Sequence, residues 1–211
     1  MKPLPGKPES RPGKTRPVVL ADRDGTLIRD VPYLSRLEDI VLLPGVASSI
    51  RLLNERGIPV AIVTNQSGVA RGYFPESFIL ESHARILGLL EEEGATVQGL
   101  YYCPHLALTE PWRGDPSLSS YHRPCGCRKP EPGLLLRALE DLSGDPAQSI
   151  MIGDAGRDME AAFAAGCRWA YRIRKKEEDG PEPEGNRTDL FYVPSFEEAV
   201  QRFLGASERS P

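Results

Sequence analysis

The sequence lacks several features that would assign it to a class of protein at once. It has only four cysteines in 211 residues, and no apolar run is long enough to span a bilayer. The N-terminal segment MKPLPGKPESRPGKTR contains proline and charged residues but no apolar centre of the kind that a secretory signal needs. We therefore predict a protein without a membrane segment that stays in the cytoplasm, where thiols are kept reduced.

An excess of positive charge is also missing. The formal net charge is −4 at pH 7, whereas binding to nucleic acids or anionic membranes usually requires a basic surface. No long apolar surface stripe stands out, so we expect a monomer. A small soluble molecule is the expected partner, with no nucleic acid and no membrane.

The chain length and composition favour a single domain. With 40% hydrophobic residues, 211 residues can bury a sizeable core, but they leave little room for a second full domain. We predict a disordered tail over residues 1–16, one domain over residues 17–206 and a short C-terminal tail over residues 207–211. No internal repeat is present, and the charged, proline-rich segment 175–187 is expected to be a surface loop.

Short apolar segments alternate with amphipathic segments along the chain. The patterns predict strands at residues 17–21, 58–64, 96–102, 148–154, 168–173 and 191–194, and helices at residues 44–57, 75–93, 132–142, 156–166 and 195–205. Ser195 is a candidate N-cap of the last helix. Parallel strands need crossover connections, so this order predicts an α/β, doubly wound, Rossmann-like parallel sheet with helices on both faces.

Acidic residues follow the first and fourth predicted strands. Asp22 and Asp24 lie in DRDGT, and Asp154 and Asp158 lie in GDAGRD. Ligands of such sheets bind beyond the carboxyl ends of the strands, where two carboxylates can act as a nucleophile and an acid/base. The alternative is that these residues only cap turns and helices. Carboxylates that converge at one edge repel one another, which implies a cation such as Mg²⁺ and a basic side chain.

Groups suited to phosphate lie elsewhere in the chain. Lys129 is the expected basic side chain, with Arg128 beside it, and the segment after the second strand offers hydroxyl, amide and backbone N–H groups. That segment comprises Thr64, Asn65, Gln66 and Ser67. Together with the carboxylates, these groups are what phosphoryl transfer through an aspartyl-phosphate requires.

Three of the four cysteines lie close to one another in sequence or beside a histidine. Cys103, His105, Cys125 and Cys127 form a Cys₃His set that suits tetrahedral Zn²⁺. Four protein ligands leave no open position, so the predicted zinc is structural. It would close the loop of residues 103–129 and fix Arg128 and Lys129. The alternatives are a disulfide or reactive pair between Cys125 and Cys127, a chance cluster, or His122 as a competing ligand, whereas Cys167 reads as an ordinary buried cysteine.

Four short motifs in this order resemble those of the haloacid dehalogenase superfamily of phosphatases: DRDGT, TNQSG, the lysine of RKP, and GDxxxD. Each follows a predicted strand, and the resemblance covers the chain from about Val18 to Ala170. It implies that Asp22 is the nucleophile and a Mg²⁺ ligand. It also implies that Asp24 is the general acid/base and binds Mg²⁺ through its backbone carbonyl.

The same resemblance implies roles for the later motifs. Thr64 and Lys129 would steady the transferring phosphoryl group, and Asp154 would complete the Mg²⁺ site. Asp158 would orient Lys129 or the shell of the metal. The spacing between the motifs leaves no room for a folded cap domain, which would need roughly 50 residues or more.

The loop of residues 103–129 (the cysteine loop) points to one family within this superfamily. YYCPH, CGCRKP and TNQSGVARGYF resemble the D-glycero-D-manno-heptose 1,7-bisphosphate 7-phosphatases, with the histidinol-phosphate phosphatases as near relatives. The resemblance implies Mg²⁺-dependent removal of the 7-phosphate of a phosphorylated sugar, in nucleotide-activated heptose synthesis. It also implies that Arg128 recognises the second phosphate. The implied substrate-binding residues are Asp30, Val31, Pro32, Tyr33, Asn65, Gln66, Ser67 and Arg128.

Two segments depart from the family pattern. Residues 106–124 are longer than in the bacterial heptose enzymes and carry Trp112 and Arg113, and VPY stands after Asp30 where well-known members have His-Gly-Tyr. Both departures bear on sugar recognition and not on phosphate chemistry. The alternative functions are a phosphatase of histidinol phosphate or another small phosphomonoester, or a non-catalytic zinc-binding module.

Overall fold

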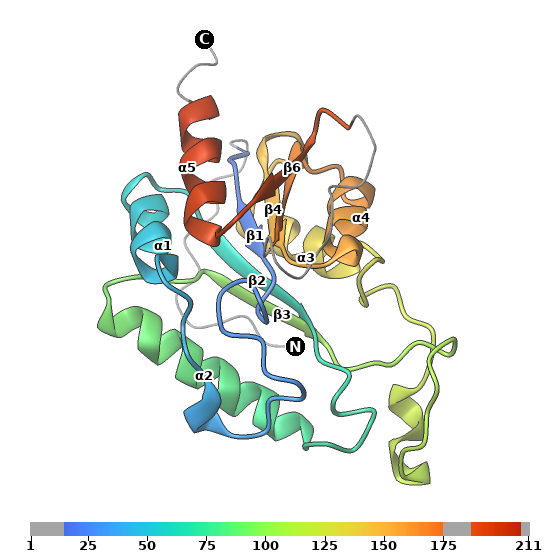
Figure 1. The fold of residues 1–211 in the computed structure, drawn as a ribbon. Helices are drawn as coiled ribbons and strands as arrows, with labels where there is room; N and C mark the ends of the chain where they lie inside the picture. Colours follow the sequence, from blue (N-terminus) through green and yellow to red (C-terminus); the bar gives the residue numbers. More distant parts are fainter. Residues whose placement is uncertain (1–14, 175–186, 208–211) are drawn as a thin grey trace.

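Six strands form one parallel sheet in the order β3-β2-β1-β4-β5-β6 (Figure 1) in a computed structural model that describes residues 15–174 and 187–207. β1 lies in the middle, because it pairs with β2 on one side and with β4 on the other. The strands are β1 (Val19–Ala21), β2 (Val60–Asn65), β3 (Gly99–Cys103), β4 (Ile150–Gly153), β5 (Trp169–Ile173) and β6 (Leu190–Val193). The predicted α/β parallel sheet is confirmed.

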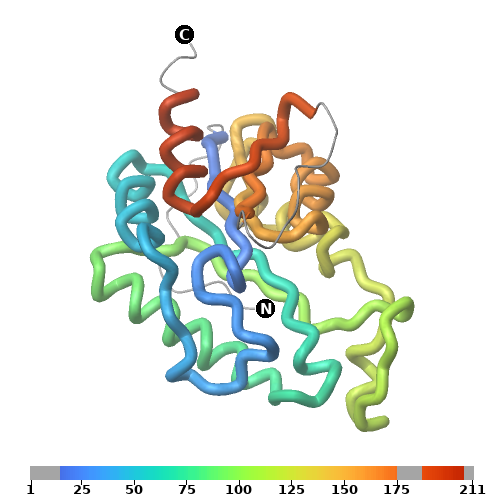
Figure 2. Tube along the Cα trace, viewed as in Figure 1, coloured from blue at the N-terminus to red at the C-terminus, as the bar shows by residue number. Residues whose placement is uncertain are grey.

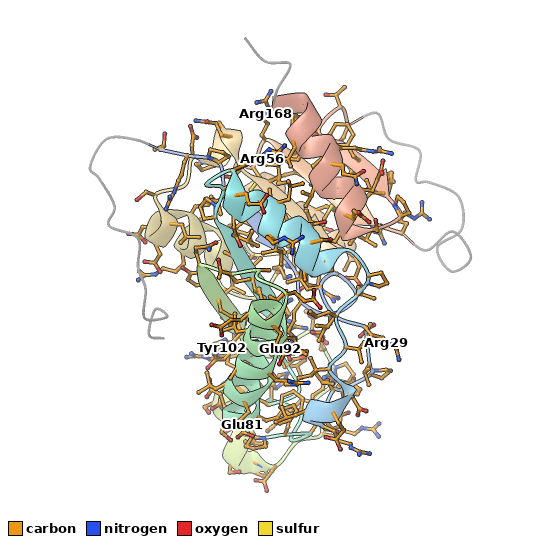
Figure 3. The ribbon with its side chains drawn as sticks, turned by 90° about the vertical axis from the view of Figure 1, so that its left-hand side faces the viewer. Arg29, Arg56, Glu81, Glu92, Tyr102 and Arg168 are labelled. Carbon is orange, nitrogen blue, oxygen red and sulfur yellow. The ribbon has the colours of Figure 1, made fainter. Side chains whose placement is uncertain are left out.

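Helices cover both faces of this sheet (Figure 2). They are α1 (Val46–Glu55), α2 (Glu76–Glu92), α3 (Gly133–Leu142), α4 (Gly156–Ala164) and α5 (Phe196–Ser207). Buried side chains of α1, α2 and α5 share one core, and those of α3 and α4 share the other. Figure 3 shows α1, α2 and α5 on the side of the molecule that faces the viewer.

The strands supply both cores by alternation of their side chains. Val19 and Ala21 of β1 belong to the core under α1, α2 and α5, whereas Leu20 belongs to the core under α3 and α4. A strand that is buried on both faces is an uninterrupted apolar run. For this reason the strands in PVVLA and IPVAIV could be predicted from the sequence. Because both faces of the sheet are covered by helices, only the ends of the strands are available to form a ligand site.

The predicted helix ends agree with the structure to within a few residues. Gly57 and Gly94 follow α1 and α2 with φ of 69° and 72°, the left-handed conformation that glycine adopts without strain. The Ser195 hydroxyl accepts a hydrogen bond from the backbone N–H of Glu198 at 3.2 Å, so the predicted N-cap of α5 is confirmed.

Five of the six strands begin one to three residues later than predicted, and the largest difference is at β3. β3 starts at Gly99 rather than at residue 96, because the preceding residues bond to the end of α1 and to β2. Asn54 Oδ1 accepts from the N–H of Thr96 at 2.8 Å, and Gln98 Oε1 accepts from the N–H of Val60 at 2.8 Å. These side chain to backbone contacts anchor the connection outside the ladder.

The predicted domain limits and location stay predictions. Residues 1–14, 175–186 and 208–211, which include most of both predicted tails and of the charged loop, lie outside the described residues. Two residues of the predicted tails belong to the folded structure: the carbonyl of Arg16 accepts from the N–H of Asp145 at 2.9 Å, and Ser207 is the last residue of α5. Within the described residues, no second folded unit is inserted after β1 or after β3, and no helix there has the length and apolar character to cross a bilayer.

Candidate active site and metal sites

The turn after β1 carries the first two aspartates. The N–H of Asp22 donates to the carbonyl of Ile152 at 2.9 Å, which ties the start of the turn to β4. Gly25 has φ of 71°, and a Cβ at this position would lie 2.2 Å from Asp154 Oδ2. Only glycine therefore lets this turn pass beneath the Asp154 carboxylate.

Lys129 lies at the centre of the site and is only 1% exposed. Its Nζ lies 2.9 Å from Asp22 Oδ1 and 2.6 Å from Asp158 Oδ1, and it donates to the carbonyl of Val63 at 2.7 Å. Burial opposes the charge of the lysine, but the Asp22 and Asp158 carboxylates outweigh burial and raise the pKa of Lys129 above its ordinary value. The site therefore holds a fixed ammonium group.

Asn65 fixes the backbone of that lysine. Its Oδ1 accepts from the N–H of Lys129 at 3.0 Å, and its Nδ2 donates to the carbonyl of the same residue at 2.9 Å. A side-chain amide with both groups bonded to one residue joins the end of β2 to the loop before α3. Asn65, which belongs to the TNQSG motif, thus holds the backbone of Lys129 in place.

Three carboxylates converge beside Lys129. Oxygen atoms of Asp22, Asp154 and Asp158 lie within 4.8 Å of one another. Burial, and then the charges of Asp22 and Asp158, raise the pKa of Asp154 to about 7. Hard divalent cations prefer such oxygen ligands, and a cation would relieve this repulsion, so the donor set fits Mg²⁺.

The two outer aspartates of this cluster differ in their contacts. Asp158 Oδ1 lies beside Lys129, and its Oδ2 accepts from the N–H of Ala155 at 3.0 Å at the start of α4. Within the described residues, no hydrogen bond or ion pair is recorded for the Asp154 carboxylate. The Asp154 carboxylate is therefore the freer of the two candidate metal ligands, whereas both Asp158 oxygens already have partners.

Asp24 points in a different direction from Asp22. Its carboxylate accepts from Arg23 Nη2 at 3.0 Å and from Gln66 Nε2 at 2.8 Å, and the same amide donates to the Thr64 hydroxyl at 2.9 Å. Thr64 is buried at the end of β2. The Asp24 side chain therefore lies outside the carboxylate cluster and faces an adjoining cavity.

The sequence analysis did not single out Arg23. This residue is 2% exposed, and besides Asp24 it donates to Gln66 Oε1 at 2.9 Å and to the Ser82 hydroxyl of α2 at 3.2 Å. A basic residue between two aspartates at the end of a buried strand is the only local signal that could have found it. Its role is to anchor the Asp24 side chain.

The predicted substrate residues divide between two cavities. The first has a volume of about 220 Å³, and the second, beside the cysteine loop, has a volume of about 540 Å³. Arg157 lines both cavities. Of the predicted residues, the first cavity is lined by Asp24, Asp30, Val31, Tyr33, Asn65, Gln66 and Ser67, and the second by Arg128 and Lys129; Pro32 lines neither.

The four predicted zinc ligands lie together at the end of β3. Cys103 Sγ is 3.1 Å from Cys127 Sγ and 3.6 Å from Cys125 Sγ, and His105 Nδ1 is 3.4 Å from Cys103 Sγ. Ligand sulfurs of tetrahedral zinc are about 3.8 Å apart, given Zn–S bonds of about 2.3 Å. The distance from Cys103 to Cys125 is close to this value and that from Cys103 to Cys127 is shorter, and all four ligand atoms lie within 4.8 Å of one another, so the donor set fits zinc. All four cysteines are free thiols, so no disulfide joins Cys125 to Cys127.

His122 is not part of this cluster. Its ring stacks on that of Trp112 with centroids 5.1 Å apart. Trp112 in turn donates from Nε1 to the carbonyl of Ala70 at 2.8 Å. His122 therefore lies outside the group of candidate zinc ligands in this structure, and segment 106–124 contacts the loop that follows β2.

Two further charged residues join that insertion to the site. Glu110 Oε1 lies 2.7 Å from Arg128 Nη2, and its Oε2 lies 2.6 Å from Arg71 Nη2. The sequence analysis missed Glu110 and Arg71. They are 39 positions apart in the chain, and no local pattern indicates that they pair.

Comparisons with known proteins agree with this geometry. A model of the haloacid dehalogenase-like hydrolases matches residues 33–166. The chain is 38% identical over 157 residues to the D-glycero-beta-D-manno-heptose-1,7-bisphosphate 7-phosphatase of Haemophilus ducreyi, which covers 74% of this chain and 82% of that protein. These comparisons support a phosphoric monoester hydrolase rather than the alternative of a non-catalytic zinc-binding module.

Solved structures show the same fold. A HAD-like protein of Mesorhizobium loti has a TM-score of 0.75 and 30% identity, with 97% of this chain and 96% of that chain covered. The D,D-heptose 1,7-bisphosphate phosphatase of B. bronchiseptica, solved with magnesium and phosphate, has a TM-score of 0.72 and 27% identity, with 90% and 99% covered. The chain therefore belongs to the haloacid dehalogenase-like hydrolases, as a phosphoric monoester hydrolase of the D-glycero-D-manno-heptose 1,7-bisphosphate 7-phosphatase family.

Proposed function

We propose that the protein hydrolyses the 7-phosphate of D-glycero-β-D-manno-heptose 1,7-bisphosphate in nucleotide-activated heptose synthesis, through an aspartyl-phosphate and with Mg²⁺. The observation that carries the proposal is the contact of the buried Lys129 with Asp22, 2.9 Å away, beside the Asp154 carboxylate. A carboxylate nucleophile, a fixed ammonium group and a cation site are the parts that phosphoryl transfer through a carboxylate needs.

Asp22 is the proposed nucleophile. One of its oxygens forms a bond to the phosphorus of the 7-phosphate while the bond from phosphorus to the C7 oxygen breaks. Asp22 is 5% exposed and its backbone is tied to β4, so little reorganisation precedes the attack. Lys129 and the Thr64 hydroxyl would stabilise the charge on the phosphoryl oxygens.

Asp24 is the proposed acid/base. It gives its proton to the leaving C7 oxygen, and then takes a proton from the water that attacks the phosphorus of the aspartyl-phosphate. Inorganic phosphate leaves and the Asp22 carboxylate is restored. The contacts of Asp24 with Arg23 and Gln66 support this role, because they hold the carboxylate at the wall of the first cavity.

Asp22, Asp154 and the backbone carbonyl of Asp24 would hold Mg²⁺. When bound, the cation neutralises charge on the phosphoryl group and on the carboxylates. Both oxygens of Asp158 already have partners, so its proposed role is to position Lys129 rather than to bind the metal directly. Cys103, His105, Cys125 and Cys127 would hold a structural Zn²⁺ that fixes the loop carrying Arg128 and Lys129.

The two cavities suit a substrate with two phosphates. The proposed position of the second phosphate is beside Arg128 in the larger cavity, and that of the sugar is along Asp30, Val31 and Tyr33 and the segment from Asn65 to Ser67. Arginine forms two parallel hydrogen bonds to a phosphate, which favours it as the recognition group. Within the described residues, Pro32 lines neither cavity and is left out of the proposed sugar site.

A substrate panel tests the proposal. We expect kcat/KM to be highest for the β-anomer of the bisphosphate, lower for the α-anomer and far lower for histidinol phosphate, all with Mg²⁺ present. Phosphorus NMR of the product should show that the phosphate on C7 is lost and the one on C1 is kept. Equal rates on histidinol phosphate, or loss of the C1 phosphate, would contradict the substrate proposal.

A further inference from the structure

A single carboxylate in the inserted segment joins two arginines from different parts of the chain. Glu110 lies 2.7 Å from Arg128 Nη2 through one oxygen and 2.6 Å from Arg71 Nη2 through the other. Arg71 belongs to the loop after β2, and Arg128 follows the last cysteine of the cysteine loop. Glu110 therefore connects the insertion to both loops that flank the cavities.

Arg128 is held from a second direction as well. Its Nη1 donates to the carbonyl of His105 at 3.2 Å. The side chains of Arg128 and Arg71 are 16% and 20% exposed, so both guanidinium groups are largely withdrawn from water. Arg128 and Glu110 both line the 540 Å³ cavity. The Arg128 guanidinium is thus anchored at the cavity wall by two contacts, one with the carbonyl of His105 and one with the carboxylate of Glu110.

The charges of this trio leave Arg128 able to bind an anion. Two arginines and one glutamate carry a net charge of +1, because Arg71 balances the carboxylate that Glu110 presents to Arg128. Without Glu110, two largely buried guanidinium groups would repel each other, and Arg128 would keep only its contact with a backbone carbonyl. The carboxylate therefore orients Arg128 without cancelling the positive charge of the trio.

We propose that Glu110 is a specificity-determining positioning residue, which acts through Arg128 to fix the subsite for the second phosphate of a bisphosphate substrate. Arg71 assists by balancing the charge of Glu110 and by fixing its carboxylate. The proposal rests on the proposed function, since it requires Arg128 to contact that phosphate. It predicts an effect on substrates with two phosphates and none on substrates with one.

The test compares steady-state kinetics on the heptose bisphosphate and on p-nitrophenyl phosphate, which has no second phosphate. The variants are Glu110→Ala, Arg128→Ala and the double variant. Glu81→Ala is the matched control, because Glu81 is an exposed carboxylate of α2 that lines neither cavity and forms no ion pair within the described residues. The zinc content of each variant is measured to show that the cysteine cluster is intact. Glu110→Gln repeats the test with a side chain of the same shape.

We expect Glu110→Ala to raise KM for the bisphosphate about tenfold with kcat little changed, the scale of one lost hydrogen bond between charged groups. KM for p-nitrophenyl phosphate should not change, and the double variant should resemble Arg128→Ala, because Glu110 acts through that residue. Glu110→Gln should give an intermediate rise, since a carboxamide oxygen accepts from one arginine only. Glu81→Ala should leave KM for the bisphosphate unchanged.

An unchanged or lower KM for the bisphosphate in Glu110→Ala and Glu110→Gln would overturn the inference, because the carboxylate would then be neutral or would repel the substrate. Equal rises on both substrates would also overturn it. If Arg128→Ala raises KM for the bisphosphate alone while the Glu110 variants do not, the proposed function survives and the role of Glu110 does not. If Arg128→Ala has no effect on that KM, the proposed phosphate subsite and the role of Glu110 fall together.

Discussion

Lys129 Nζ lies 2.6 Å from Asp158 Oδ1, and neither side chain has any exposed surface. The second carboxylate partner of Lys129 is Asp22, the proposed nucleophile, whose Oδ1 lies 2.9 Å from Nζ. Removing such charges from water costs more free energy than an apolar replacement would, so this arrangement is poorly explained by stability alone. It is explained by the need for a fixed positive charge beside a carboxylate nucleophile.

Replacing Lys129 should therefore destabilise the fold as well as abolish activity. Lys129→Met leaves the Asp22 and Asp158 carboxylates buried without their cation, and we expect a loss of about 3–5 kcal/mol in the free energy of unfolding. Urea unfolding measures this change. The matched control is Arg137→Met on α3, whose exposed pair with Asp141 should contribute less than about 1 kcal/mol. Equal unfolding midpoints for the two variants would contradict this account of the buried cluster.

Asp22→Asn should separate chemistry from folding. The carboxamide has nearly the same shape, and it removes one negative charge from a cluster with three carboxylates and one lysine. We expect kcat to fall at least about 10³-fold, because no other group can form the acyl-phosphate. Circular dichroism and the melting temperature should show a folded protein. A turnover rate near that of the unchanged protein would exclude Asp22 as the nucleophile.

The fold and the centre of the site could be predicted from the sequence because both depend on order along the chain. Buried strands are apolar runs, and strand ends carry the polar residues, so Asp22, Thr64 and Asp154 had to meet at one edge. The two short-spaced pairs, Cys103 with His105 and Cys125 with Cys127, likewise predicted a metal-binding cluster. These features need no knowledge of how distant segments pack.

The rest of the site depends on contacts that no local pattern records. Glu110 pairs with Arg71 from a loop 39 positions away, and Arg23 pairs with a serine of α2 that is 59 positions away. The opposite directions of Asp22 and Asp24 also depend on tertiary partners, since Lys129 draws one carboxylate and Arg23 and Gln66 draw the other. Such ion pairs and hydrogen bonds are set by the packing of segment 106–124 and of α2.

Binding of Mg²⁺ should depend on pH because of Asp154. Burial, with the neighbouring Asp22 and Asp158 carboxylates, raises the pKa of Asp154 to about 7 in the metal-free protein, above its ordinary value of 3.8. A raised carboxyl pKa favours the protonated form, so its contribution to stability is complete below the ordinary pKa and is lost as the pH rises through 7. The cation needs the ionised form and therefore competes with this proton.

We accordingly expect the dissociation constant for Mg²⁺ to fall about tenfold between pH 6 and pH 8, with release of close to one proton at the lower pH. Calorimetric titrations in two buffers of different ionisation enthalpy measure both quantities. Asp154→Asn should bind Mg²⁺ weakly and lose most of the pH dependence. The same affinity at pH 6 and pH 8 in the unchanged protein would contradict the assignment of Asp154 as a ligand.

Cys125→Ser should lower the zinc content and the thermal stability together. The hydroxyl is a poor zinc ligand, and loss of one of four ligands releases the loop that carries Arg128 and Lys129. The matched control is Cys167→Ser, because Cys167 is a buried cysteine under α4 that lies outside the cluster. That variant should lose stability through the burial of a hydroxyl but keep its zinc. Metal analysis and thermal unfolding of both variants make the comparison, and an unchanged zinc content in Cys125→Ser would exclude Cys125 as a ligand.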